Sequence, residues 1–250
     1  KTIEYMRASG REEAECALME AYFRAQGLFG VPRAGDIDYT RTLVLDLATI
    51  HFLLGHEEAG QAYQDAALLR SQVFRDGASG TGQPAVRLLA FAAPGDLMSN
   101  VPIQFLIENS DIQLDVLYVV PGEDLPEKVP DHDMAMVIVG ESGPNREVLE
   151  RIAAFADLWP RQPVLNDPRK VLQLSRDGVS TLLAGAPDIR IPATARVDPD
   201  TLARLGRGEE ELAGLLPDGS FPVIARPLNS HAGKGLASVG LVAGQVVGRS

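Results

Sequence analysis

The sequence predicts a multidomain protein with an all-α helical-repeat leader, then an α/β Rossmann-like parallel sheet, then an α+β lobe. In the first 75 positions, apolar residues recur at spacings of three and four, as on the buried face of a helix. From Ala85 onwards, continuous apolar runs alternate with helical patterns, which is typical of a parallel sheet covered on both faces. Near the end of the chain, two apolar runs flank a glycine-containing turn, which indicates a pair of returning strands.

The helical leader contains an internal repeat. Gly10, Glu12, Glu13, Ala14, Ala17 and Ala21 recur 45 positions later as Gly55, Glu57, Glu58, Ala59, Ala62 and Ala66. Residues 41–75 resemble a tetratricopeptide repeat, with one helix through Leu54, a turn at Gly55 and a second helix. The small residues of the second helix (Ala59, Ala62 and Ala66) would let a neighbouring helix approach closely. An ordinary helical hairpin is the alternative, and in either case such a segment more often binds a partner than performs chemistry.

The Rossmann-like part is predicted from three buried strands at residues 86–93, 114–120 and 134–139, with helices at 101–108 and 146–158. A linker rich in Gly and Ser precedes it and marks a domain boundary. We therefore predict three domains, at residues 1–77, 84–166 and 167–250.

Polar residues follow the predicted strands, where open α/β sheets bind their ligands. Asp96 and Asn100 follow the first strand, and Glu141, Asn145 and Arg146 follow the third. Two interpretations stay open: these residues line a substrate site, or Asp96 and Asn145 only cap helices. The first strand is not followed by GxGxxG, which argues against an NAD-binding protein.

Composition excludes several classes of protein. The formal net charge of −11 and the lack of a basic patch argue against nucleic-acid and membrane-surface binding. Cys16 is the single cysteine, so an intrachain disulfide cannot form. No apolar run has the roughly 20 residues that span a bilayer, and no signal peptide is recognisable, so we expect a cytoplasmic protein. The first residue is Lys1 and the end is abrupt, so we expect a fragment of a longer protein.

The α+β lobe carries the most specific pattern. The buried run FPVIAR ends in Arg226 and is followed by Pro227, a turn, and a second strand from Leu236. The backbone amides of such a glycine-containing turn can close over phosphate groups. A plain β-hairpin is the alternative. The turn residues of interest are Ser230, His231, Gly233, Lys234 and Gly235.

This hairpin, with Arg176 and the segment Ile191, Pro192, Ala193, Thr194 upstream, resembles the ATP-grasp ligase superfamily. The resemblance implies a pre-ATP-grasp domain before a truncated first ATP-grasp lobe, as in a bacterial member fused to tetratricopeptide repeats. It implies that Arg226 and Arg176 contact phosphates and that the turn covers ATP. Both positions usually hold lysine, but arginine also suits phosphate oxygens.

The same resemblance implies a carboxylate–amine ligase that uses ATP and Mg²⁺ through an acyl phosphate, with the metal ligands expected beyond residue 250. This chain alone would then be inactive. The alternative is a non-catalytic scaffold that binds a protein partner through its helices and has a degenerate nucleotide-binding domain. The sequence identifies neither the catalytic residues, nor the small-molecule or peptide substrate, nor the oligomeric state.

Overall fold

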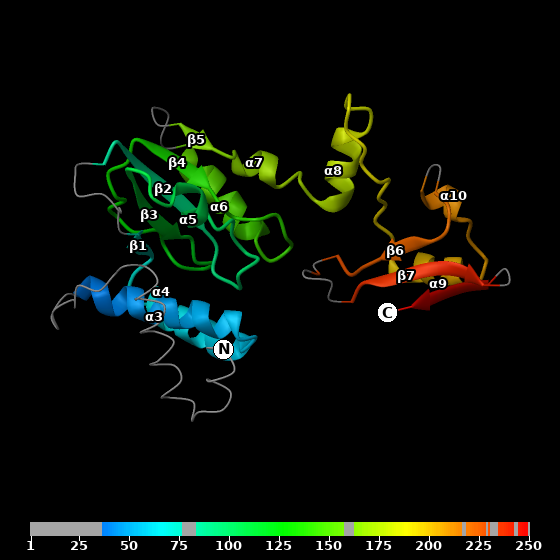
Figure 1. The fold of residues 1–250 in the computed structure, drawn as a ribbon, viewed down its shortest axis with the longest axis horizontal. Helices are drawn as coiled ribbons and strands as arrows, with labels where there is room; N and C mark the ends of the chain where they lie inside the picture. The colour runs from blue at the N-terminus through cyan, green and yellow to red at the C-terminus, as the bar shows by residue number, and fades with distance from the viewer. Residues whose placement is uncertain are drawn as a thin grey trace. The chain divides into compact units, whose positions relative to one another are not determined.

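The computed structural model describes residues 37–76, 84–157, 163–216, 219–228, 230, 235–242 and 245–249. These residues form two compact units (Figure 1). The first contains the described residues up to Gly140 together with Glu147–Pro168, and the second contains Glu141–Arg146 and the described residues from Arg169 onwards. Part of the predicted linker, residues 77–83, lies outside the described residues.

A helical hairpin begins the first unit. Helix α3 (Ile37–Leu53) and helix α4 (Glu57–Leu68) are antiparallel neighbours joined through Gly55. Gly60 is buried at their crossing, where an added Cβ atom would lie 2.7 Å from the ring of Phe52. The close approach that we predicted therefore occurs, but at Gly60, whereas Ala62 is exposed. The first copy of the repeat, residues 10–21, lies outside the described residues.

The segment after α4 is a strand, although the sequence pattern predicts helix through residue 75. Strand β1 (Val73–Asp76) pairs antiparallel with β3 (Ile112–Tyr118). Tertiary packing decides this, because Phe74 is buried with Ala67 and Leu68 against the partly buried Tyr118. The hairpin and the sheet therefore share a core. Burial raises the pKa of Tyr118 to about 12, with a smaller contribution from Asp46.

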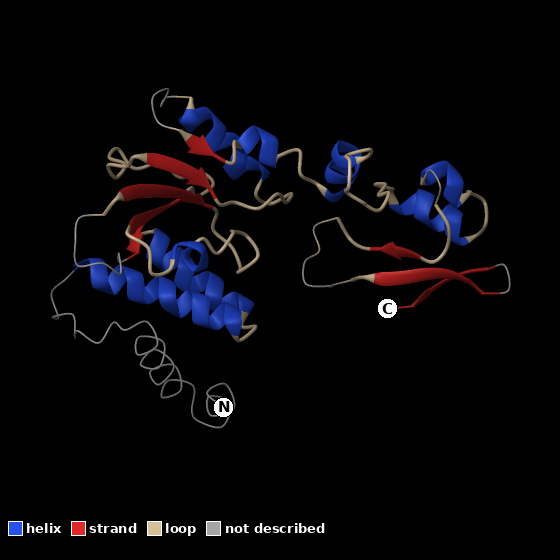
Figure 2. Ribbon diagram, turned by 45° about the horizontal axis from the view of Figure 1, so that its top comes forward, coloured by secondary structure: helices blue, strands red, loops and turns tan. Residues whose placement is uncertain are grey.

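A five-stranded sheet with the order β1-β3-β2-β4-β5 forms the centre of the first unit. Strand β2 (Val86–Ala92) is parallel to both β3 and β4 (Met134–Val137), and β4 is parallel to the short β5 (Val164–Leu165). Figure 2 shows helices packed against these strands. The three buried strands begin and end within two residues of the predicted runs.

Both faces of β2 are buried, which explains its continuous apolar sequence. On one face, Leu88 and Ala90 cluster with Ile103, which precedes helix α5 (Gln104–Ile107). On the other, Phe91 meets Phe155 of helix α6 (Arg146–Ala156) edge to face, with ring centroids 6.0 Å apart.

Helix α5 is shorter than the predicted helix at residues 101–108. The backbone at residues 100–101 is extended instead, because Asn100 forms a bridge with Val139 and the amide of Val101 donates to the carbonyl of Ile138 over 2.7 Å. Only the residues after Pro102 are free to form a helix. The predicted helix at residues 146–158 agrees with α6.

The second unit contains short helices and a three-stranded antiparallel sheet. Its sheet has the order β6-β7-β8, formed by β6 (Val223–Ala225), β7 (Ala237–Val242) and β8 (Gln245–Arg249). Before the sheet come helix α7 (Pro168–Val171), which starts in the first unit, α8 (Arg176–Leu183), α9 (Pro199–Gly206) and α10 (Leu212–Leu215). The predicted pair of returning strands is present, with Ala225 opposite Ala237.

Side-chain caps begin two of these helices. The Ser175 hydroxyl accepts a hydrogen bond from the amide of Gly178, and the Asp198 carboxylate accepts one from Thr201 over 2.8 Å. The Thr201 amide and hydroxyl lower the pKa of Asp198. Both helices therefore start where the sequence supplies an acceptor.

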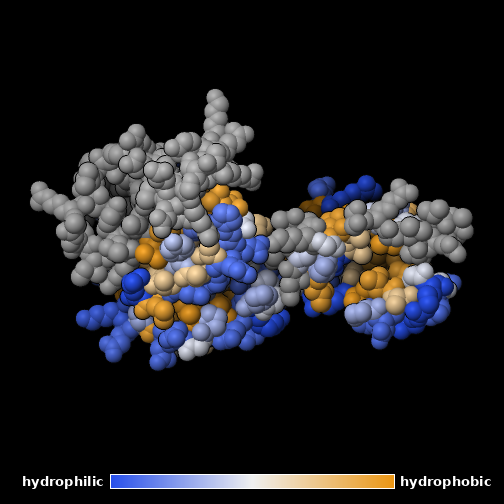
Figure 3. Space-filling view, turned by 90° about the horizontal axis from the view of Figure 1, so that it is seen from below, coloured by the Kyte–Doolittle hydropathy of each residue, from blue (hydrophilic) through white to orange (hydrophobic). Residues whose placement is uncertain are grey.

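The described surface is mixed in polarity. Phe105 of α5 and Ile224 of β6 are exposed, and Figure 3 shows hydrophobic residues interspersed among hydrophilic ones on one face of each unit. Single exposed apolar residues are normal on protein surfaces. None of the described helices is long and apolar enough to cross a membrane.

Candidate functional site

The carboxyl ends of β2 and β4 form the candidate site of the first unit. The chain leaves β2 for β3 on one side and leaves β4 for β5 on the other, so the topology switches direction between them. Ligands of open α/β sheets bind at such a switch point. The loop after β2, residues 93–100, lies at this edge and contains the predicted residues Asp96 and Asn100.

Asn100 closes this loop at its base. Its Oδ1 accepts a hydrogen bond from the amide of Ala93, and its Nδ2 donates to the carbonyl of the same residue, each over 2.8 Å. Next to Asn100, the carbonyl of Ser99 accepts a hydrogen bond from the amide of Gly140, which follows β4, over 2.9 Å. Asn100 thus fixes the loop, and a role in contacting substrate stays a prediction.

Gln64 of α4 holds the middle of the same loop. Its Oε1 accepts from the amide of Gly95 over 2.7 Å, and its Nε2 donates to the Gly95 carbonyl over 3.1 Å. Gly95 has φ of +140°, a conformation that favours glycine. Sequence reasoning missed Gln64, although a buried polar residue on the same helix face as Gly60 and Ala67 is a recognisable signal.

Asp96 turns the loop rather than capping a helix. Its Oδ1 accepts from the amide of Met98 over 2.9 Å and from the hydroxyl of Ser99 over 3.3 Å. Asn166, which was not predicted as a site residue, follows β5 and donates from Nδ2 to the carbonyl of Val137 over 3.1 Å. Side-chain amides of Gln64, Asn100 and Asn166 therefore fix the backbone at this edge of the sheet.

The other predicted substrate residues, Glu141, Asn145 and Arg146, group with the second unit. The amide of Asn145 donates to the hydroxyl of Ser142, and the amide of Arg146 donates to the carbonyl of Gly143, each over 3.2 Å. These bonds shape the turn that leads into α6. The role of these three residues in binding substrate also stays a prediction.

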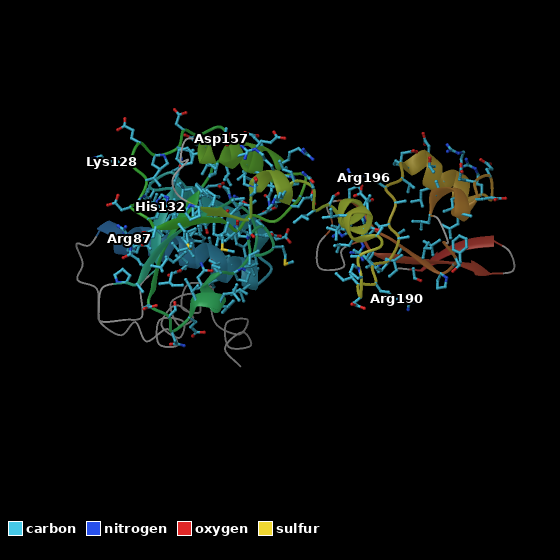
Figure 4. All side chains as sticks on the ribbon, turned by 90° about the horizontal axis from the view of Figure 1, so that it is seen from above. Arg87, Lys128, His132, Asp157, Arg190 and Arg196 are labelled. Carbon is cyan, nitrogen blue, oxygen red and sulfur yellow. The ribbon has the colours of Figure 1, made fainter. Side chains whose placement is uncertain are left out.

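The opposite edge of the sheet, at the amino ends of β2 and β4, carries an ion pair. Arg87 donates to both carboxylate oxygens of Asp133, with the shorter contact at 2.7 Å. Figure 4 shows Arg87, Lys128 and His132 at this end of the unit. Hydrogen bonding from the Arg87 side chain lowers the pKa of Asp133 to about 2.

We expect the Asp133 carboxyl to titrate near pH 2 in the folded protein, below the value of about 3.9 for an unfolded aspartate. Because the folded-state pKa is the lower one, the pair favours the folded state above pH of about 4. This contribution disappears as the pH falls towards 2. Carboxyl-detected NMR titration measures the pKa, and Arg87→Gln should move it back towards 3.9. An Asp133 pKa that Arg87→Gln leaves unchanged would contradict this assignment.

In the second unit, Arg176 is bound to the loop between β6 and β7. Its guanidinium donates to the carbonyls of Leu228 over 3.0 Å and Ser230 over 2.6 Å. Gly235 has φ of +68°, and an added Cβ atom would lie 2.8 Å from Pro227, so the turn requires glycine. Arg226 is exposed at the end of β6. His231, Gly233 and Lys234 lie outside the described residues.

A second arginine stabilises the start of α8. Arg196 donates to the Asp177 carboxylate over 3.0 Å, and Figure 4 shows Arg196 beside this helix. Burial opposes the charged form of Asp177, but hydrogen bonds from Arg196 and Ser175 outweigh it and lower the pKa of Asp177.

Within the part of the chain that the structure describes, no three His, Cys, Asp or Glu side chains are grouped as metal ligands.

Comparison with known proteins gives partial matches to a different class of enzyme. The chain is 46% identical over 50 residues to aconitate hydratase A of Deinococcus radiodurans, which covers 20% of this chain and 6% of that protein. It is 46% identical over 48 residues to aconitate hydratase A of Bradyrhizobium diazoefficiens, and the match covers 19% of this chain and 5% of that protein. It is 32% identical over 96 residues to aconitate hydratase A of Streptomyces viridochromogenes, and the match covers 38% of this chain and 10% of that protein.

The chain thus spans only about a twentieth of the length of the first two relatives. No family model matches the chain, and no solved structure does either.

These matches correct the sequence-based identification. The predicted tetratricopeptide-fused ATP-grasp ligase, its carboxylate–amine ligase activity and its ATP and Mg²⁺ cofactors are wrong, because the relatives found are aconitate hydratases. The physical reason is that a strand, a glycine turn and a returning strand form a common local structure. Moreover, Arg176 already binds main-chain carbonyls of the adjoining loop. The chain is similar to aconitate hydratase A over part of its length.

Proposed function

We propose that the first unit binds a small polycarboxylate of the aconitate class at the carboxyl edge of β2 and β4. The observation that carries this proposal is the loop of residues 93–100, which Gln64 and Asn100 hold in one conformation through paired amide hydrogen bonds. A fixed loop loses little conformational entropy when a ligand binds. The class of ligand follows from the similarity to aconitate hydratases.

Binding rather than hydration is proposed, because the chain does not fit an iron–sulfur cofactor of the kind that a hydratase relationship would imply. Such clusters are held by several cysteine thiolates. The whole sequence has a single cysteine, Cys16. No catalytic step through a cluster is therefore assigned to this chain.

The negative charge of the loop opposes the binding of an anion. Asp96 places a carboxylate in the loop, and the chain carries a net charge of −11. Both repel a polycarboxylate, so we expect weak binding that improves as salt screens the repulsion. Asp96→Asn keeps the oxygen that accepts from Met98 and Ser99 and removes the charge.

We expect aconitate to raise the melting temperature of the full chain in a saturable way, and tricarballylate, its saturated analogue, to do the same. Asp96→Asn should tighten binding about fivefold, since one unit charge a few ångströms away is worth about 1 kcal/mol in water. Isothermal titration calorimetry measures the affinity. Glu127→Gln is the matched control, because it removes one exposed charge from the loop that precedes β4 at the opposite edge.

Equal effects of the two substitutions would place the ligand elsewhere and contradict the proposed site. Absence of saturable binding by either tricarboxylate would contradict the proposed function.

A further inference from the structure

The end of α3 has a backbone arrangement that brings two specific side chains together. Gly55 adopts φ of +74°, its amide donates to the carbonyl of Phe52 over 3.0 Å, and the amide of His56 donates to the carbonyl of His51 over 2.9 Å. These two bonds define a Schellman motif. In this motif the side chains at the positions of His51 and His56 contact each other, and both are usually apolar.

Here both side chains are imidazoles. The Nδ1 atoms of His51 and His56 lie 3.4 Å apart. The ring of Tyr63 from α4 stacks on His51, with centroids 5.0 Å apart and planes 14° apart, which fixes the orientation of the His51 ring. His51 is buried and His56 is exposed, so the pair has one rigid member and one member that faces solvent.

The separation of the two nitrogen atoms suits a bound metal ion. It is longer than the usual range of about 2.7–3.2 Å for hydrogen bonds to nitrogen donors. A tetrahedral ion with metal–nitrogen distances of about 2.0–2.1 Å holds two ligand nitrogens about 3.3–3.4 Å apart. We propose that His51 and His56 chelate a first-row transition metal ion that accepts tetrahedral coordination, such as Zn²⁺, through their Nδ1 atoms.

The surroundings favour a cation. The carboxyl end of α3 carries the partial negative charge of the helix dipole. The first turn of α4 adds the acidic residues Glu57 and Glu58. Because the described residues offer no group of three ligands, water would complete the coordination shell. The site would exchange its metal readily and would not be a closed structural site.

Metal titration of the metal-free full chain tests the proposal. We expect one Zn²⁺ to bind per chain by calorimetry and to raise the melting temperature, as any ligand of the folded state does. With one equivalent of Cu²⁺, electron paramagnetic resonance should show hyperfine coupling to two imidazole nitrogens. His56→Asn should weaken Zn²⁺ binding at least tenfold and remove one of the two couplings.

His56 is exposed and its side chain caps no helix, so His56→Asn should fold, which circular dichroism checks. His231→Asn is the matched control, since it removes an imidazole from a different part of the sequence and should leave Zn²⁺ affinity unchanged. The proposal is overturned by absence of saturable Zn²⁺ binding, by equal affinities of His56→Asn and the unaltered protein, or by coupling to a single nitrogen.

Discussion

Phe91→Ala should lower the free energy of unfolding of the first unit by about 3–5 kcal/mol. Phe91 is fully buried in β2, the central strand, and its ring packs edge to face on Phe155 of α6. The substitution removes the transfer free energy of the ring and leaves a cavity between sheet and helix. It also removes an aromatic pair worth about 0.5–1.5 kcal/mol.

Urea denaturation followed by circular dichroism measures the change, and hydrogen exchange of peptides from β2 and β3 assigns it to the first unit. Phe105→Ala is the matched control. It removes the same ring from α5, where the side chain is 77% exposed, and should change stability by less than about 0.5 kcal/mol. Similar losses in the two variants would show that the packing of Phe91 on α6 is assigned wrongly.

Arg75→Met should destabilise the same unit by about 1–3 kcal/mol. Arg75 of β1 lies directly opposite Asp115 of β3, and its guanidinium donates to both carboxylate oxygens over 2.8 and 3.2 Å. The Asp115 side chain is only 4% exposed. Without the guanidinium, the buried carboxylate loses its compensating charge, and among the described residues the Gln113 side-chain amide, at 3.1 Å, still donates to it.

The double variant Arg75→Met, Asp115→Leu separates the loss of the pair from the loss of packing. Replacing both charged residues with apolar ones leaves no uncompensated charge, so its stability should return to within about 1 kcal/mol of the unaltered protein. Chemical denaturation of the four variants in the cycle measures this. A double variant no more stable than Arg75→Met would mean that the single substitution acts through packing.

The periodicity of the sequence located most elements because those elements are defined by burial of neighbouring residues. The runs that form β2, β3 and β4 are continuous and apolar, since both faces of the sheet are covered. Helix α6 has a clear amphipathic pattern with Val148, Leu149 and Ile152 buried. Strand β1 was missed because its four residues gain their conformation from pairing with a distant strand.

The candidate site was only partly predictable. The switch-point loop with Asp96 and Asn100 follows from the rule that ligands bind beyond the carboxyl ends of strands. Gln64 lies on a helix 31 residues before Gly95, and although its place on the buried helix face is recognisable, the sequence does not indicate which residue it contacts. The histidine pair is five residues apart, and only the turn at Gly55 brings the two rings together.

The sequence by itself determined the alternation of buried strands and helices, the glycine turns at Gly55 and Gly235, and the excess of negative charge, because each depends on local composition. The tertiary structure decided which side chains fix the loop after β2, and it showed that Arg176 binds carbonyls of its own unit. Such contacts join residues far apart in the chain. A short motif therefore predicted a hairpin correctly and its function wrongly, since function depends on what surrounds the motif.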